Sequence, residues 1–336
     1  MRVARVHGPH DLRLHDEPLP TPGPGEALVR VTAVGICGSD LHWLAEGGIG
    51  ADRITTPFVL GHECAGVIES GARAGQHVAI DPAITCGHCE YCERGLANLC
   101  QRLRFAGHTP TDGAMQEFLA WPERFLVPLP DSLSDAEGAL LEPLGVAMYA
   151  VELGGVRPGM SVAVAGCGPI GLCLLDVARE AGATLLLATE LPGLPHRAGA
   201  AEARGATVFA GGDGHEVDEL LEATGGRGVD VAFEAAGDPE AVDAAVAAVK
   251  PGGRVVIVGI PCEDRISFTA SVARRKDLRL HIAHRMMHTY PGAIALVRSG
   301  RVHVADLVSH RFPLERIGDA FEVGHRREGL KVLIEP

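Results

Sequence analysis

Aromatic side chains are scarce in this chain, and so are the features that would place it in a membrane or on nucleic acid. Phe, Trp and Tyr together make up 4% of the 336 residues. No apolar run approaches the length of a membrane span. There is no basic tail, and the formal net charge is −13. This balance argues against nucleic acid and anionic membrane surfaces as partners.

Two further absences bear on the compartment. The N-terminus lacks the charged-then-apolar layout of a signal peptide. The nine cysteines form an odd number, which argues against a complete disulfide framework. We therefore expect reduced thiols and a cytoplasmic protein.

What the chain does have is length, apolar residues and glycine. Its length favours two domains over one. Hydrophobic residues make up 46% of the sequence, which is enough for a sizeable core, and there are 43 glycines. Many glycines suit tight turns and close approach of the backbone to ligands.

The first candidate metal site lies within residues 34–63. It offers a thiol (Cys37), an imidazole (His62) and a carboxylate (Glu63). This mixture suits Zn²⁺, and three protein ligands leave the open position that a catalytic zinc requires. Taken alone, the three residues are better explained as a buried Cys, a core His and a surface Glu, because free Cys is among the most buried residue types.

The second metal signal is stronger because it contains four cysteines close together. The spacing C-x2-C-x2-C-x7-C is formed by Cys86, Cys89, Cys92 and Cys100. Four thiolates can enclose one tetrahedral Zn²⁺ without an open position, as in a structural site. The alternatives are two disulfides, a redox pair, an iron–sulfur cluster or a zinc ribbon on nucleic acid. The spacing and the acidic charge favour the closed zinc.

The residues around these motifs predict a β-rich, barrel-like domain. Short strands separated by Gly and Pro include Ala27–Val34 and Gly66–Glu69. A capping box of Ser134 and Glu137 then predicts a helix. This helix would carry Glu142, either as an exposed residue at a kink or as a carboxylate directed at the metal region.

From about residue 155 the pattern changes to strand–helix alternation. The apolar strand Ser161–Ala165 runs directly into a glycine motif, G-x-G-x-x-G, and a helical stretch follows. In this context Gly166 forms the tight turn, Gly168 lets the backbone approach a pyrophosphate and Gly171 permits close helix–strand packing. The sequence therefore predicts a doubly wound parallel sheet that binds a dinucleotide.

The next strand ends at Glu190, 19 positions after Gly171. A carboxylate there can accept hydrogen bonds from the adenosine ribose and would repel a 2′-phosphate. We therefore expect NAD rather than NADP, although Arg197 could face the same ribose.

With these motifs in hand, the chain resembles the zinc-dependent medium-chain dehydrogenases, within them the sorbitol or polyol dehydrogenase branch. The resemblance covers essentially the whole chain. The segments that carry it are Cys37–His42, Gly61–Glu63, the Cys86–Cys100 cluster, Leu141–Leu144, Gly166–Gly171 and Ser309–Glu315. It implies a GroES-like catalytic domain over 1–150 with a structural-zinc lobe at 81–105. A Rossmann domain over 151–285 and a return to the catalytic domain over 286–336 complete the expected organisation.

The resemblance also implies roles for individual residues. Cys37, His62 and Glu63 would bind the catalytic zinc, with Glu142 near it as a possible further ligand. Ser39 and His42 would relay the alcohol proton. The implied cofactor contacts, besides the three glycines, are Ile170, Glu190, Arg197, Val258, Gly259, Ile260, Ala283, His284 and Arg285. The implied substrate contacts are Trp43, Glu142, Arg285 and Met286.

The expected function is transfer of a hydride from a secondary alcohol of a polyol to NAD⁺, giving a ketone, with two zinc ions per chain. Trp43 and Met286 stand where the sorbitol enzymes usually carry Tyr, so two fewer hydroxyls would face the substrate. The alternatives are an L-threonine 3-dehydrogenase or a 2,3-butanediol dehydrogenase on the same scaffold, and a non-catalytic cofactor-binding protein. A homo-oligomer, tetramer or dimer, is also expected.

Overall fold

The structure is a computed structural model that describes residues 1–212 and 214–336. The described residues form two units, Met1–Glu142 with Tyr290–Pro336, and Pro143–Thr289. The sequence places domain boundaries at 150 and 285. The structural boundaries differ because one helix, α3 (Asp135–Gly154), continues through the first of them. Among the described residues, none of the helices combines the length and the apolar character needed to cross a membrane.

The first unit is built mainly from strands. Its strands are β1 (Arg2–Gly8), β2 (Asp11–Asp16), β3 (Glu26–Gly35), β4 (Gly48–Ile49), β5 (Asp52–Arg53), β6 (Phe58–Val59), β7 (Glu63–Ile68), β8 (His77–Ile80), β9 (Ala83–Ile84), β10 (Arg104–Phe105), β11 (Phe118–Pro122), β12 (Leu126–Pro128), β19 (Val308–Pro313) and β20 (Lys331–Glu335). Its helices are α1 (Gly38–Glu46), α2 (Glu90–Glu93), α9 (Tyr290–Arg298) and α10 (Ile317–His325). Short 3₁₀ turns lie at Ala97–Leu99, Glu123–Phe125, Val304–Leu307 and Leu314–Arg316.

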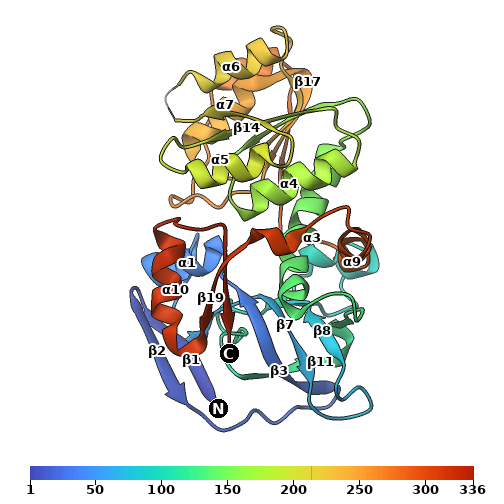
Figure 1. The fold of residues 1–336 in the computed structure, drawn as a ribbon, viewed down its shortest axis with the longest axis vertical. Coiled ribbons are helices and arrows are strands. Elements are labelled where there is room, and N and C mark those ends of the chain that lie inside the picture. The colour runs from blue at the N-terminus through green and yellow to red at the C-terminus, as the bar shows by residue number, and fades with distance from the viewer. Residues whose placement is uncertain (213) are drawn as a thin grey trace. The chain divides into compact units, whose positions relative to one another are not determined.

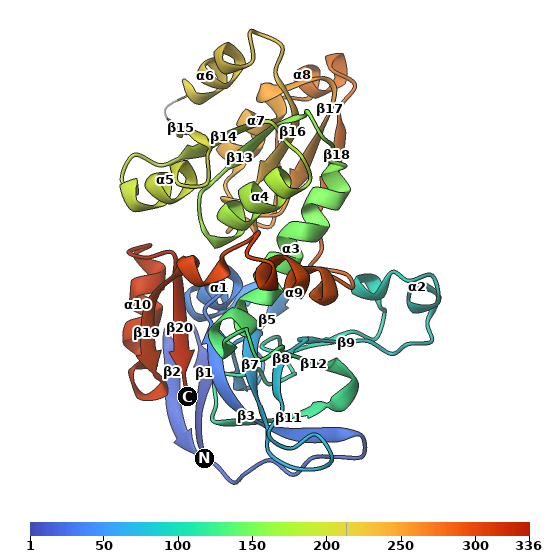
Figure 2. The ribbon, with the colours of Figure 1, turned by 45° about the vertical axis from the view of Figure 1, so that its right-hand side comes forward.

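The main sheet of this unit has the order β12-β8-β7-β3-β20-β19, and β11 also pairs with β3. The C-terminal strand β20 lies antiparallel to β3, so the end of the chain contributes to the sheet that contains β3 and β7 (Figures 1 and 2). Strand β3 alternates between buried and more exposed residues, whereas all six residues of β7 are buried. The strand β7 therefore lies in the middle of the packed region, as its apolar composition requires.

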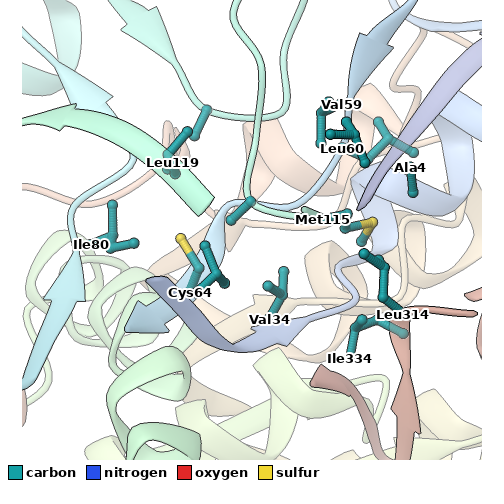
Figure 3. Close-up of a cluster of buried hydrophobic side chains, with 14 of the residues drawn as sticks. Ala4, Val34, Val59, Leu60, Cys64, Ile80, Met115, Leu119, Leu314 and Ile334 are labelled. Atoms are coloured by element: carbon teal, nitrogen blue, oxygen red, sulfur yellow. The ribbon is translucent and has the colours of Figure 1, made fainter. Parts of the chain in front are cut away.

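The core of the first unit joins side chains from distant parts of the sequence. Figure 3 shows Val34 of β3, Cys64 of β7 and Ile334 of β20 in one buried cluster with Met115 and Leu314. These residues are at most 1% exposed. Burial of this apolar surface stabilises the arrangement by about 25 cal/mol per Å². The same packing fixes the strand ends that carry the site residues.

The helix α3 begins as its sequence predicts. The Ser134 backbone N–H and hydroxyl both donate to Glu137 Oε2, at 2.8 and 2.7 Å, and Glu137 N donates to Ser134 Oγ at 3.3 Å. This reciprocal pair confirms the predicted capping box. Pro143 lies inside the helix without ending it.

The second unit is a parallel sheet with helices between its strands. The strands are β13 (Ser161–Ala165), β14 (Leu185–Glu190), β15 (Thr207–Ala210), β16 (Val229–Glu234), β17 (Val249–Ile257) and β18 (Arg279–Ile282), in the order β15-β14-β13-β16-β17-β18. The helices are α4 (Pro169–Glu180), α5 (Pro195–Glu202), α6 (Glu216–Ala223), α7 (Pro239–Ala248) and α8 (Ala270–Arg275). Figure 2 shows α4 and α5 beside β13 and β14.

This strand order is that of a dinucleotide-binding doubly wound sheet, with the order reversing beside β13. The predicted parallel sheet is thus confirmed within the part of the chain that the structure describes. Helix α7 ends at Ala248, and β17 begins directly after it at Val249. Val229 of β16 also pairs with Val249 of β17, so these two strands pair from their N-terminal ends, with a shift in register after the first pair.

Candidate active site

Three candidate metal ligands meet in the first unit. Each of these residues, Cys37, His62 and Glu63, offers one donor atom, and the three atoms lie within 4.8 Å of one another. His62 is 6% and Glu63 1% exposed, and Cys37 is partly buried. Cys37 and His62 are 25 positions apart in the sequence, so the fold assembles this set.

The strand register explains the meeting. Strand β3 ends at Gly35, and Cys37 follows immediately before helix α1. In the β3–β7 ladder Gly35 pairs with Glu63. The thiol therefore emerges beside the start of β7, where His62 and Glu63 lie. A Cβ on residue 35 would stand 2.1 Å from Glu63 Oε2, so the carboxylate occupies space that only glycine leaves open.

Asp40 holds this assembly together and was not identified from the sequence. It is fully buried and accepts hydrogen bonds from the backbone N–H groups of Cys37 (2.9 Å) and Gly61 (3.1 Å). Its Oδ1 also lies 3.7 Å from His62 Nδ1, which is too long for a hydrogen bond. A carboxylate three positions after Cys37 at a helix start was the available signal.

The donor atoms fit a dication. The buried His62 Nδ1 has no hydrogen-bond partner. Burial, with the charge of Glu63, raises the pKa of Cys37 to about 12. Without a cation the thiol would stay protonated, and a bound metal would favour the thiolate. One thiolate, one imidazole and one carboxylate are the ligand types that Zn²⁺ accepts in open sites.

Glu142 lies on α3 and is 5% exposed. Burial raises its pKa to about 8, and the groups that influence it are His62, Glu63, Cys37 and Lys331. The carboxyl therefore faces the metal region, but it is not part of the three-residue donor group. The alternative that the sequence left open, an exposed Glu142 at a helix kink, is therefore wrong.

The two residues expected in a proton relay have different surroundings. Ser39 Oγ lies 3.5 Å from His62 Nε2, beside the donor set. His42 instead pairs with Glu46, one helical turn later, with Nδ1 2.8 Å from Oε1. Both side chains lie on α1, whose N-terminus follows Cys37.

The role of Trp43 as a substrate contact, which the resemblance implies, needs correction. Its side chain is 1% exposed and belongs to the core of the first unit. The ring packs edge-on against Phe58 and His108, with centroids 5.1 and 5.2 Å away. A large apolar indole in this position is covered by protein, so it has no free face for a substrate.

The four clustered cysteines also come together. Their sulfur atoms all lie within 4.8 Å of one another, and none forms a disulfide. The Cys86–Cys92 and Cys89–Cys100 sulfur pairs are 4.0 and 3.9 Å apart. Tetrahedral Zn–S bonds place sulfur atoms about 3.8 Å apart. Hydrogen bonds from backbone N–H groups of Cys92 and Gln101 lower the pKa of Cys89 to about 6, which favours the thiolate that zinc needs.

In the second unit the glycine motif has the geometry that the sequence predicts. Gly166 adopts a positive φ of 92°. A Cβ on Gly171 would lie 1.9 Å from the Gly166 carbonyl oxygen, so this helix turn can only pack on the strand without a side chain. Gly168 has open space, with Arg197 Nη1 3.6 Å from a Cβ built there. The backbone and a guanidinium thus surround the space expected for phosphate.

Glu190 ends β14 and is tied to the glycine motif. Its Oε2 accepts a hydrogen bond from Cys167 N at 2.9 Å, and its Oε1 accepts one from Leu191 N at 2.8 Å. The side chain is 8% exposed. Each oxygen retains a further lone pair for a ribose hydroxyl.

The other expected cofactor residues follow the ends of neighbouring parallel strands. Ile170 lies in the first turn of α4, Val258–Ile260 follow β17, and Ala283–Arg285 follow β18. Arg285 adopts a positive φ of 59°, and Met286 accepts a hydrogen bond from the Thr289 hydroxyl at 3.3 Å.

A buried acid that the sequence reasoning missed, Glu234 at the end of β16, forms hydrogen bonds with the loop after its own strand and with the loop after β17. Its Oε1 accepts from Ala236 N and Gly237 N, at 2.7 and 2.6 Å. Its backbone oxygen accepts from Val258 N and Gly259 N, at 2.8 and 3.1 Å. An acid at the end of an apolar strand was the signal available, as for Glu190.

Comparisons with known proteins decide the family. Residues 23–131 match the model of the alcohol dehydrogenase GroES-like domain, and residues 169–299 match that of the zinc-binding dehydrogenases. Sorbitol dehydrogenase of Bacillus subtilis is 36% identical, covering 100% of this chain and 97% of the relative.

Two solved structures agree over full length. The 2R,3R-butanediol dehydrogenase of Bacillus subtilis has a TM-score of 0.89 at 31% identity and covers 100% of this chain and 99% of that one. An alcohol dehydrogenase from Escherichia coli complexed with the cofactor NADH has a TM-score of 0.91 at 26% identity, with the same coverage.

The chain belongs to the zinc-dependent medium-chain dehydrogenases. The resemblance noted from the motifs is confirmed, as are the GroES-like and Rossmann-type folds. The chain is therefore an enzyme, an alcohol dehydrogenase that uses zinc and a nicotinamide cofactor, and the non-catalytic alternative is set aside.

Proposed function

We propose that this dehydrogenase oxidises a secondary alcohol of a polyol, or of a related polyhydroxylated compound, to a ketone with NAD⁺. The observation that carries the proposal is the convergence of Cys37, His62 and Glu63 into one three-ligand donor set. The likeness to sorbitol dehydrogenase supports the substrate class.

The chain's own residues have distinct tasks in this reaction. Cys37, His62 and Glu63 hold the catalytic zinc, and the four cysteines hold a structural zinc. When bound, the catalytic zinc supplies a Lewis acid for the hydroxyl and NAD⁺ supplies the hydride acceptor. Ser39, beside His62, accepts the alcohol proton and passes it on through His42. Glu142, which lies near the donor set, offers a carboxyl for a further hydroxyl.

The cofactor is held by the second unit. The glycine motif and the N-terminus of α4 bind the pyrophosphate. Glu190 accepts hydrogen bonds from the ribose, and its charge would repel a 2′-phosphate. Val258–Ile260 and Ala283–Arg285, at the ends of β17 and β18, complete the cofactor contacts. The preference for NAD⁺ follows from Glu190.

Arg285 is the residue we assign to recognition of the polyol. A guanidinium offers five donors in a fixed fork and keeps its charge at all working pH values. A polyol carries several hydroxyl acceptors along its chain for such a fork, whereas a simple aliphatic alcohol carries one. Met286, which follows Arg285, contributes an apolar contact.

The test is a comparison of kcat/KM for vicinal polyols and cyclitols with that for ethanol and 2-propanol, using NAD⁺ and NADP⁺. We expect polyols and NAD⁺ to be favoured. In Arg285→Ala the polyol advantage should largely disappear, and in Glu190→Ala the discrimination against NADP⁺ should relax. An equal loss on every alcohol in Arg285→Ala would assign Arg285 to the cofactor alone. Better turnover of simple alcohols by the wild type would refute the polyol class.

A 2,3-butanediol dehydrogenase is the second candidate, because a solved 2R,3R-butanediol dehydrogenase matches the whole chain at a TM-score of 0.89. An L-threonine 3-dehydrogenase on the same scaffold remains in the substrate panel. Butanediol has two hydroxyls and apolar ends, so it would depend less on Arg285 than a longer polyol does. The same panel separates these substrates.

The assembly and compartment complete the proposal. We place the enzyme in the cytoplasm because nine cysteines without a disulfide fit a reducing environment. We expect a homo-oligomer, a tetramer or a dimer. Sedimentation of the purified protein at several concentrations measures this directly.

A further inference from the structure

A buried lysine at the start of the last strand contacts the candidate zinc ligand Glu63. Lys331 Nζ lies 2.7 Å from both carboxylate oxygens of Glu63 and donates to the carbonyl oxygen of Ile36 at 3.0 Å. The two side chains are 3% and 1% exposed. Among the described residues, Lys331 is the only buried lysine or arginine.

The sheet brings this pair together across a strand that has no side chain at the crossing point. Strands β7 and β20 lie on either side of β3, and Gly35 of β3 pairs with Glu63 on one side and with Leu333 on the other. A Cβ at position 35 would meet Glu63 Oε2 at 2.1 Å. The carboxylate therefore passes over Gly35 to reach the ammonium.

The contacts link Lys331 to both segments that supply zinc ligands. Glu63 is a ligand itself, and Ile36 is the residue before Cys37. Hydrogen bonds to both segments orient them relative to each other without the metal. Groups that hydrogen-bond to metal ligands in this way set the orientation of the ligands and the strength of metal binding.

Charge gives Lys331 a second effect. The site contains the thiol of Cys37 and the buried carboxyls of Asp40, Glu63 and Glu142. The ion pair, with Lys331 Nζ 2.7 Å from both oxygens of Glu63, places a positive charge beside a carboxylate that a dication also needs. Ammonium and dication compete for the negative charge of Glu63.

We propose that Lys331 is a positioning residue of the catalytic zinc site, which keeps Glu63 and Cys37 assembled in the metal-free protein and limits how tightly zinc is held. The proposal rests on the proposed function, in that the Cys37 set is the zinc site. According to this proposal, loss of the lysine strengthens zinc binding. Loss of a purely structural residue would weaken it.

The test compares Lys331→Met with the wild type in two measurements on the purified full chain. The first is the melting temperature of the metal-free protein, which should fall because Glu63 loses its partner in a buried site. The second is the zinc affinity, measured by competition with a chromophoric chelator. The Cys37→Ser variant, which should bind zinc only at the four cysteines, gives the contribution of that site, and it is subtracted. Removing the competing charge should tighten zinc binding at the Cys37 site by about tenfold or more.

Three controls separate charge from packing. Lys331→Arg keeps the charge and should retain an affinity within a few-fold of wild type. Lys331→Gln removes the charge but keeps a donor for Glu63, so it should also tighten zinc binding, and it serves if Lys331→Met does not fold. Lys276→Met removes a half-buried lysine of the second unit that donates to the carbonyls of Ala247 and Val249, and zinc affinity should not change.

The outcomes are distinct. Unchanged or weaker zinc binding in both Lys331→Met and Lys331→Gln overturns the proposal. So does tighter binding in Lys331→Arg equal to that in Lys331→Gln, because the effect would then not depend on charge. Absence of zinc binding that depends on Cys37 in the wild type would instead refute the proposed function itself.

Discussion

The two candidate zinc sites of the first unit differ in how their ligands are brought together. The four cysteines lie within 15 consecutive positions, 86–100, around the short helix α2 and a 3₁₀ turn, in a lobe that Figure 2 shows standing out from the sheet. The set of Cys37, His62 and Glu63 is collected from the ends of two strands and lies against buried carboxyls. One site is a local chain feature, and the other is a product of sheet register.

The contrast teaches that the local site, in the four-cysteine lobe, and the assembled site, formed by Cys37, His62 and Glu63, depend on different supports. In the four-cysteine lobe, backbone N–H groups from the same loop lower the pKa of Cys89. At the assembled site, Asp40 and Lys331 provide the support, and both are buried side chains. We therefore expect changes at the assembled site to affect chemistry first and changes in the lobe to affect folding first.

The largest effect should come from Cys37→Ser. Serine keeps the volume but is a much poorer zinc ligand than a thiolate, so the Lewis acid is lost. A loss worth several kcal/mol lowers kcat by about 10³-fold or more. Zinc content should fall from two ions to one per chain in elemental analysis, with circular dichroism unchanged. An active Cys37→Ser enzyme would contradict the assignment.

The next effect concerns stability, in Cys89→Ser. Structural zinc contributes directly to folding, so loss of one of its four ligands should cost roughly 3 kcal/mol or more of unfolding free energy. Calorimetry would detect this as a lower melting temperature, with one zinc lost. The folded fraction should retain the catalytic zinc. If melting is unchanged, the lobe does not bind metal and the comparison between the sites fails.

Asp40→Asn should have a smaller effect, on the assembled site alone. Both carboxylate oxygens of Asp40 accept backbone N–H groups, so the amide NH₂ of Asn would face a donor. Loss of such a support typically costs about 10- to 100-fold in metal affinity or activity. Chelator competition and kcat measure it. Wild-type values in both would show that the backbone alone positions Cys37.

The smallest effect is expected from Arg94→Ala in the lobe. Arg94 pairs with Glu90 one turn away at 3.0 Å, and their side chains are 59% and 68% exposed. An exposed pair of this kind contributes only about 0.3–0.5 kcal/mol. Melting temperature and zinc content should match wild type closely. A loss of zinc would show that the lobe depends on this surface pair as well as on its backbone.

Much of the second unit could be predicted because its constraints are local. Gly166 and Gly171 have roles set by a turn and by a 1.9 Å approach to a carbonyl, and both follow from the motif in its strand–helix context. Glu190 could be found in the same way, by its place at the end of a strand. Glu234 occupies an equivalent position but lacks a motif, so its hydrogen bonds to the loops after β16 and β17 became visible only in the structure.

At the assembled site, fewer of the residue environments could be predicted from the sequence. Trp43 was expected to face substrate, yet it packs against Phe58 and His108, because burial depends on residues far along the chain. Asp40 and Lys331 carry no spacing signal that separates them from an ordinary helix cap and an ordinary strand residue. Their roles depend on pairing between β3, β7 and β20.

The sequence by itself determined the ligand types, the four-cysteine cluster, the dinucleotide motif and the family, since these depend on residue chemistry at short separations. Tertiary structure alone decided that Glu63 passes over Gly35 to Lys331, that Asp40 supports Cys37 and that Trp43 belongs to the core. The physical reason is that strand register places residues hundreds of positions apart in contact. Lys331 and Glu63, 268 positions apart, meet for that reason.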